Sequence, residues 1–127
     1  MTEVVLDSSA VIAYLRGEPG GAALRSLLPQ AALSMVNLAE VLGRLVALGQ
    51  TIDQAKEAVD VLSIRHVAFD DQLATETAAL LPLTRHLGLS LGDRACLALA
   101  RGESLPVLTA DRAWASLQVG VEIRMIR

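Results

Sequence analysis

Residues 90–111, SLGDRACLALARGESLPVLTAD, decide the fold class of this chain. The first part, 90–101, has the spacing of a helix, is strongly apolar through 95–100, and is stopped by Gly102. The part at 106–109 has the composition of a short buried strand. A helix that runs directly into a buried strand is typical of parallel sheets, because parallel strands need helical crossovers.

Strand-like and helix-like segments alternate through the rest of the chain. Further strands are expected at 4–6, 32–35, 64–69 and 121–126. Helices are expected at 8–16, 22–28, 36–48, 51–62 and 70–81, with short turns at 84–87 and 112–117. No hairpin signal competes with this pattern. We therefore predict a single α/β domain over residues 1–127, in which helices cover both faces of a parallel sheet.

The composition excludes several classes of protein. A hydrophobic content of 53% with 20% charged residues is incompatible with disorder, and 127 residues are enough to bury a core. No apolar run reaches the ~18 residues that cross a bilayer, and no basic leader precedes the first strand. Cys96 is the only cysteine, so an internal disulfide is excluded. We expect a cytoplasmic protein with no membrane association.

Acidic residues stand where four apolar runs stop, and they are Asp7, Glu40, Asp93 and Asp111. Two of them, Asp7 and Asp111, follow expected strands, and ligand sites in open parallel sheets form beyond the carboxyl ends of strands. Carboxylates gathered there repel one another unless a divalent cation lies between them. Hydroxyls at Ser8 and Thr109 are expected to orient two of the carboxylates.

Each of the four acids also has a purely structural explanation. Two would cap the helices that follow strands, one would form a capping box, and one would form an ion pair along a helix. These explanations concern Asp7 and Asp111 as caps, Asp93 with Ser90, and Glu40 with Arg44. Asp70 also follows a strand-like run and is interpreted only as a cap.

The segments around the four acids resemble one known family. They are VVLDSSAVIAYL, SMVNLAEVLGRL, LSLGDRACLALA and VLTADRAW. Together they are similar to the PIN-domain family and, within it, to the VapC-type ribonuclease toxins of bacterial toxin–antitoxin pairs. The resemblance extends over almost the whole chain, and none of the four acidic positions of the family is substituted.

The resemblance implies a three-layer α/β/α sandwich and a metal-dependent endoribonuclease that hydrolyses RNA phosphodiester bonds. One or two Mg²⁺ or Mn²⁺ ions would be held by Asp7, Asp93 and Asp111. Glu40 would complete the catalytic set and help to orient the nucleophile. The implied partners are a second copy of the chain in a homodimer and a VapB-type antitoxin. An exposed apolar groove formed by 22–28 and 36–48 is expected to receive that antitoxin.

Arg94 and Arg112 each follow a site acid directly, and we expect them to contact the RNA backbone. Two alternatives stay open at this point. One is a non-catalytic α/β interaction module whose acids are only caps. The other is a different magnesium-dependent phosphoryl-transfer protein. A dehalogenase-type phosphatase would need an aspartate at Ser9, and a receiver domain would need a lysine after a late strand, whereas Lys56 lies in an expected helix.

Overall fold

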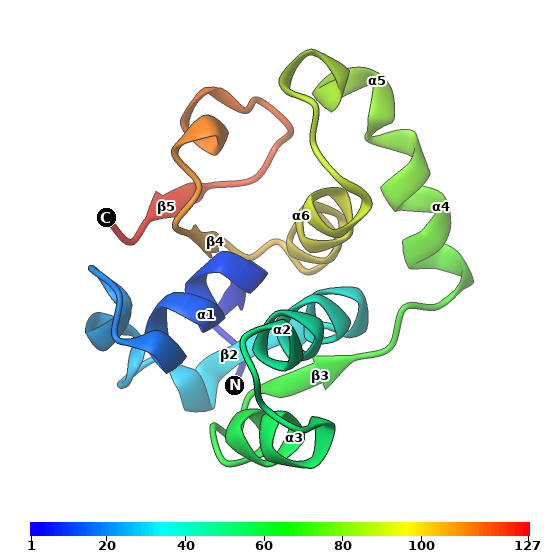
Figure 1. Ribbon diagram of the computed structural model, residues 1–127. Helices are drawn as coiled ribbons and strands as arrows, with labels where there is room; N and C mark the ends of the chain where they lie inside the picture. Colours follow the sequence, from blue (N-terminus) through cyan, green and yellow to red (C-terminus); the bar gives the residue numbers. More distant parts are fainter.

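The computed structural model describes residues 1–127 as five parallel strands with helices around them (Figure 1). The strands are β1 (Val4–Leu6), β2 (Ala31–Ser34), β3 (Arg65–Val67), β4 (Val107–Thr109) and β5 (Ile123–Met125). Their order in the sheet is β3-β2-β1-β4-β5, and every neighbouring pair is parallel. The predicted parallel sheet is confirmed, and its central strand β1 is the one that ends at Asp7.

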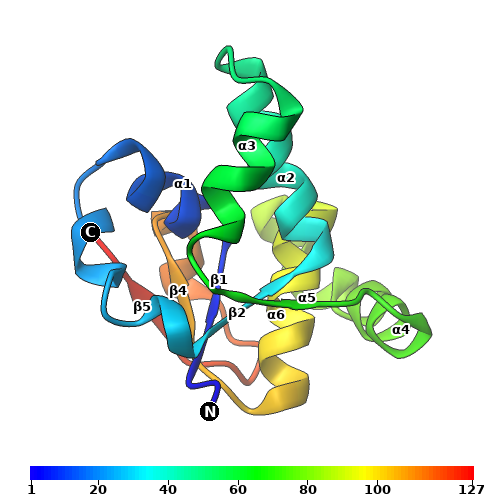
Figure 2. The same cartoon turned by 90° about the horizontal axis from the view of Figure 1, so that it is seen from below.

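Helical segments form every connection between the strands. The α-helices are α1 (Ser8–Arg16), α2 (Met35–Ala47), α3 (Ile52–Asp60), α4 (Asp71–Ala79), α5 (Leu81–Thr84) and α6 (Leu91–Glu103). Short 3₁₀ helices are η1 (Gly21–Leu24), η2 (Leu28–Gln30), η3 (Arg85–Leu87) and η4 (Arg112–Ser116). Seen from below, α4 and α5 lie at the outer edge of the molecule, beyond α6 (Figure 2).

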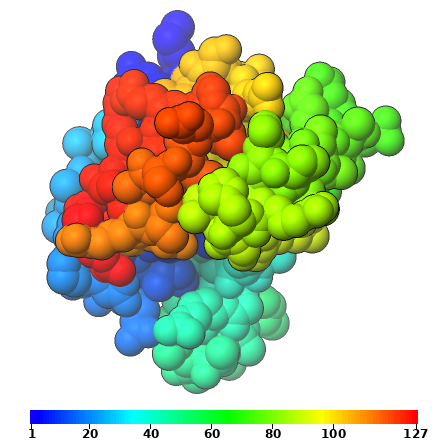
Figure 3. All heavy atoms as spheres, turned by 90° about the horizontal axis from the view of Figure 1, so that it is seen from above, coloured from blue at the N-terminus to red at the C-terminus, as the bar shows by residue number.

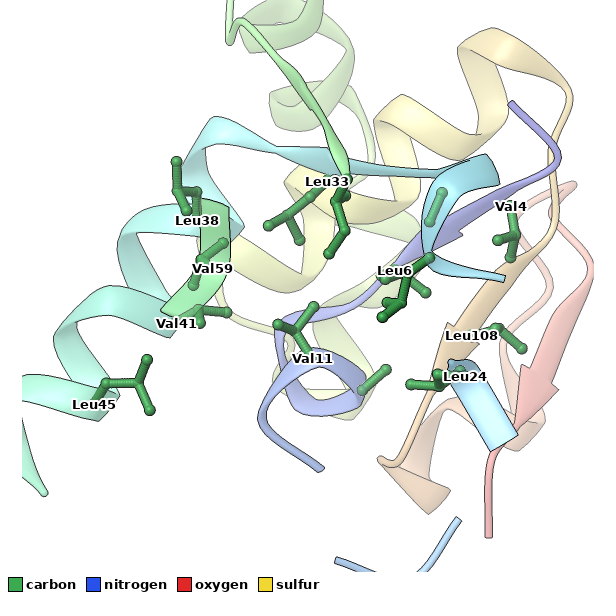
Figure 4. Close-up of a cluster of buried hydrophobic side chains, with 14 of the residues drawn as sticks. Val4, Leu6, Val11, Leu24, Leu33, Leu38, Val41, Leu45, Val59 and Leu108 are labelled. Carbon is green, nitrogen blue, oxygen red and sulfur yellow. The ribbon is translucent and has the colours of Figure 1, made fainter. Parts of the chain in front are cut away.

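Successive residues of β1 point to opposite faces of the sheet and join two separate cores. Val4 and Leu6 belong to the first core, with residues of α1, α2 and α3 (Figure 4). Val5 belongs to the second core, with residues of α6. This alternation is what a strand buried on both faces requires. The second core also contains Trp114, and the segments at 80–90 and 105–125 that enclose it meet at the surface (Figure 3). The three-layer α/β/α arrangement is therefore confirmed.

The helix expected at 22–28 was wrong. The chain forms the two short 3₁₀ turns η1 and η2 instead, with Pro29 in the first turn of η2. Gly21 is buried and lies so close to the backbone of Ala13 that any Cβ there would overlap it. A segment held this close to α1 at one end and interrupted by proline at the other has no room for a continuous helix.

The expected groove between 22–28 and 36–48 is not exposed at its main apolar positions. Leu24 and Leu28 are buried, and so are Leu38, Val41 and Leu45 of α2. All five belong to the first core. These leucines and this valine therefore stabilise the fold and offer no apolar surface to a partner. None of the helices is both long and apolar enough to cross a membrane.

Candidate functional site

Asp7 is a buried carboxylate at the end of the central strand. It is only 2% exposed, and its Oδ2 accepts hydrogen bonds from the hydroxyls of Ser9 (2.6 Å) and Thr109 (2.9 Å). Its Oδ1 is buried and has no hydrogen-bond partner. Asp7 stands at the N-cap position of α1, as its structural explanation predicted, but its side chain makes no capping bond to the helix.

Burial raises the pKa of Asp7 from its ordinary value of 3.8 to about 6. The hydrogen bonds from Ser9 and Thr109 oppose this rise, the negative charge of Asp93 adds to it, and the nearby backbone N–H of Ser8 opposes it more weakly. A buried carboxylate that is left with an unpartnered oxygen destabilises the free protein. Such a group is therefore suited to a ligand that carries positive charge, since a nearby cation favours the ionised carboxylate and so lowers its pKa.

Glu40 and Asp93 are brought together by close contact between α2 and the start of α6. A Cβ on Gly92 would overlap the Glu40 carboxylate, so glycine at this position lets Glu40 lie directly against the start of α6. The buried amide of Asn37 donates to Glu40 Oε1 (2.9 Å) and to the carbonyl oxygen of Gly92 (3.0 Å). Asn37 thus fixes the orientation of Glu40 beside the residue that precedes Asp93.

Asp93 begins α6 in a capping box with Ser90, as its structural explanation predicted. Its Oδ2 accepts the backbone N–H of Ser90 (2.9 Å), and the Ser90 hydroxyl accepts the N–H of Asp93 (3.2 Å). The cap uses one carboxylate oxygen and leaves the other without a partner in the fold. Capping and metal binding are therefore compatible at Asp93, because a carboxylate has several lone pairs to share.

Asp111 is exposed and caps η4, where its Oδ1 accepts the backbone N–H of Ala113 (3.0 Å). Its own N–H donates to the Thr109 hydroxyl (3.0 Å), the same hydroxyl that donates to Asp7. Thr109 is therefore the link between the carboxylates at the ends of β1 and β4. The cap predicted for Asp111 is confirmed, and one of its oxygens also remains available.

The fully buried thiol of Cys96 lies among three of the four acids. Its pKa is raised well above the ordinary value by burial and by the charges of Asp7, Asp93 and Glu40. The Sγ atom donates a weak bond to the Leu6 carbonyl (3.6 Å), directly before Asp7. Asp111 does not contribute to this effect. Asp7, Asp93 and Glu40 are thus near enough to one buried group to raise its pKa, and Thr109 links Asp7 to Asp111 by hydrogen bonds.

The donor set suits a hard divalent cation, because it consists of carboxylate oxygens and includes the unpartnered Oδ1 of Asp7. No three or more histidine, cysteine, aspartate or glutamate side chains are already arranged as a metal cage. The site is therefore a cluster of anchored carboxylates whose free oxygens would have to converge on an ion. Hydroxyl donors fix the orientation of the Asp7 carboxylate, and an amide donor fixes that of Glu40.

The two arginines singled out by the sequence have different surroundings. Arg94 is partly buried, and its Nη1 donates to the carbonyl oxygen of Thr77 in α4 (3.1 Å). This bond holds the guanidinium on α4 and favours a structural role. Arg112 is exposed and forms no ion pair, so it is free to meet a ligand. The ion pair predicted between Glu40 and Arg44 does not form.

Sequence reasoning missed three residues that shape the site. Ser9, not Ser8, supplies the hydroxyl that orients Asp7. Asn37 and Gly92 were assigned no role in the site, because the contact between α2 and α6 that gives them one is not visible in the sequence. Spacing offered one usable signal, since Asn37 stands three residues before Glu40 and shares its helix face.

Comparisons with known proteins agree with this architecture. The model of the PIN domain family matches residues 4–119. Among solved structures, the fold is similar to VapBC2 from Rickettsia felis bound to a promoter DNA fragment (TM-score 0.76, 14% identity, 98% of each chain covered). A toxin–antitoxin complex from Klebsiella pneumoniae is similar to the same extent (TM-score 0.75, 20% identity, 98% of each chain covered).

A third structure, VapBC-5 from Mycobacterium tuberculosis, matches with a TM-score of 0.65 and 26% identity over 100% of this chain and 99% of the other. No curated protein sequence matches the chain.

Proposed function

Because the chain belongs to the PIN domain family, we propose that it is a metal-dependent endoribonuclease and the toxin of a toxin–antitoxin pair. The observation that carries this proposal is the buried Asp7, whose unpartnered Oδ1 and raised pKa call for a cation. Mg²⁺ or Mn²⁺ fits the all-oxygen donor set. The antitoxin partner is inferred from the toxin–antitoxin complexes whose fold this chain shares. A homodimer is also expected.

Asp7, Asp93 and Asp111 would hold one or two ions through the oxygens that their hydrogen bonds leave free. When bound, such an ion supplies Lewis-acid activation of the phosphodiester and of the attacking water. The hydroxyls of Ser9 and Thr109 keep Asp7 in one orientation. Glu40, fixed at Oε1 by Asn37, keeps Oε2 free to accept a hydrogen bond from the attacking water. Arg112 is available to contact the RNA backbone.

The decisive test is cleavage of single-stranded RNA by the purified chain with Mg²⁺ or Mn²⁺. We expect cleavage with either ion, none in excess EDTA, and none with Asp7→Asn. Asp70→Asn is the matched control, because Asp70 caps α4 by accepting the N–H of Leu73 (2.9 Å) and asparagine caps equally well. Full activity of Asp7→Asn, or cleavage that persists in EDTA, would contradict the proposal.

The non-catalytic alternative draws support from the caps that Asp93 and Asp111 form. It predicts that Mn²⁺ binds no more tightly to the wild type than to Asp7→Asn. Calorimetric titration of both proteins with Mn²⁺ separates the two functions without any assay of activity. A clear loss of Mn²⁺ affinity in the variant would exclude the alternative.

A further inference from the structure

A groove of about 480 Å³ opens beside Glu40, one of the four site acids. Its other lining residues include Ser8 and Ser9 at the start of α1, Glu18, and Arg44 of α2. Arg127, at the carboxyl end of the chain, lines it too. Figure 1 shows that the C-terminus lies on the same side of the molecule as α1. Its volume lies within the range of about 300–1,000 Å³ that is typical of ligand sites.

Arg44 contributes a positive charge that the protein itself does not neutralise. It is exposed, and no carboxylate lies within ion-pair distance, although Glu40 stands one helical turn before it. Glu40 is held instead by the amide of Asn37. The guanidinium of Arg44 is therefore free to bind an anion that enters the groove beside Glu40.

Arg127 is placed in the groove by the loop that follows α1. Gly20 has a φ of +83°, and a Cβ there would overlap the carbonyl oxygen of Ile126, so the loop lies directly on the C-terminal segment. The Nη1 of Arg127 is 3.4 Å from Glu18 Oε1 and 3.4 Å from the Pro19 carbonyl oxygen. These long bonds are solvent-exposed and weak, so a phosphate can replace them at little cost.

We propose that Arg44 and Arg127 bind backbone phosphates of single-stranded RNA directly beside the bond that is cut. This inference rests on the proposed function and adds the path of the substrate. The groove shares Glu40 with the site, so a strand that lies in it would pass directly beside one of the four acids. Guanidinium groups bind phosphate through two parallel hydrogen bonds. The sequence instead singled out Arg94, whose guanidinium is bonded to Thr77.

The test measures RNA binding in the Asp7→Asn background, in which cleavage is absent. The dissociation constant of a fluorescent single-stranded RNA is measured by anisotropy at several KCl concentrations. Arg44→Gln and Arg127→Gln should each weaken binding about threefold to tenfold at low salt. Each should also lower the slope of log Kd against log[KCl] by about 0.7, the value for one phosphate contact on a single strand.

Arg85→Gln is the matched control, because Arg85 is likewise exposed and without an ion pair but lies in η3, outside the groove. It should leave both affinity and slope unchanged. In the active chain, Arg44→Gln should raise KM with little change in kcat, since Arg44 contacts only the flanking phosphate.

Three outcomes are distinguishable. If the two groove variants lower the affinity and slope and Arg85→Gln does not, the inference stands. If wild-type RNA cleavage is intact but the groove variants bind RNA as their parent does, the inference fails and the proposed function survives. In that case the arginines would serve a protein partner. If the wild type neither cleaves nor binds RNA, both proposals fail together.

Discussion

Asp7 and Asp111 stand just beyond two neighbouring strands, yet their side chains differ in exposure and in hydrogen bonding. Asp7 is 2% exposed, its side chain makes no capping bond to α1, and one of its carboxylate oxygens has no hydrogen-bond partner. Asp111 is exposed and caps the turn that follows β4. The two residues are separated by one hydroxyl, that of Thr109, which bonds to both.

The difference arises from what covers the end of each strand. β1 lies in the centre of the sheet and leads into the nine-residue helix α1, which contributes to the first core and closes over Asp7. β4 leads into the 3₁₀ turn η4, which points its cap into solvent. Similar positions after a strand thus yield one buried carboxylate with a raised pKa and one exposed carboxylate. We expect the buried carboxylate of Asp7 to contribute most to metal binding.

The largest expected effect contrasts the two acids directly. Asp7→Asn should lower kcat for RNA cleavage by about 10²–10³-fold or more, because a metal ion supplies several kcal/mol of transition-state stabilisation. Asp111→Asn should lower it by only about tenfold, since asparagine keeps the cap and the oxygen that it replaces with an NH2 group is exposed to solvent, whereas Asp7 is buried. Single-turnover kinetics with saturating Mn²⁺ measures both. If kcat fell equally in the two variants, Asp7 would not contribute more to metal binding than Asp111 does.

The next effect is on the stability of the metal-free protein. The pKa of Asp7 is about 6 in the folded protein, against its ordinary value of 3.8. Between these two pH values the folded state binds more protons than the unfolded state. The free energy of unfolding therefore falls as the pH rises from about 4 to about 6. Asp7→Asn should remove this loss and stabilise the protein at pH 7.5 by up to about 3 kcal/mol, with no gain near pH 4. Urea unfolding in EDTA from pH 4 to 8 measures the difference. If the free energies of unfolding of the variant and the wild type differed by the same amount at every pH, the pKa of Asp7 would not be raised in the folded protein.

A smaller effect tests the contact between α2 and α6. Gly92→Ala should push the Glu40 carboxylate away and lower kcat about tenfold, while stability changes little because the displaced atoms end a flexible side chain. Gly43→Ala is the matched control, since a Cβ there meets no atom within 4 Å. It should stabilise α2 by about 1 kcal/mol and leave cleavage unchanged. Thermal unfolding and initial rates of both variants provide the comparison.

The smallest effect concerns the hydroxyl that joins the two acids. Thr109→Val should cost about 1 kcal/mol of stability at pH 7.5, because Asp7 and the N–H of Asp111 each lose a hydrogen bond. It should also raise the pKa of Asp7, since the bond from Thr109 lowers it in the wild type. Urea unfolding across the same pH range detects both changes. An unaltered pH profile would show that the hydroxyl does not act on Asp7.

Much of the fold could be predicted from the sequence because the signals are local. Short apolar runs that alternate with capped helices indicate parallel strands, and both predicted caps at Ser90 and Asp111 exist. The order of the strands could not be predicted, since pairing joins segments far apart in the chain. The residues 22–28 were misjudged for the same reason, because the backbone of Ala13 decides their conformation.

The four acids could be singled out because each ends an apolar run, but their environments could not. Burial of Asp7 depends on α1 and β4, and the orientation of Glu40 depends on a glycine in α6. The arginines show the limit most clearly. Proximity in sequence pointed to Arg94 and Arg112, and only the fold shows that Arg44 and Arg127 line a groove together with Glu40.

The caps at Asp93 and Asp111 have one more consequence. Each carboxylate holds the first turn of its helical segment with one oxygen, so the turn cannot fray without releasing the acid. Loss of structure at these two helix starts therefore also releases both carboxylates from their fixed positions. Amide hydrogen exchange at Ser90 and Ala113, whose N–H groups bond to these carboxylates, would report how often the free protein loses this arrangement.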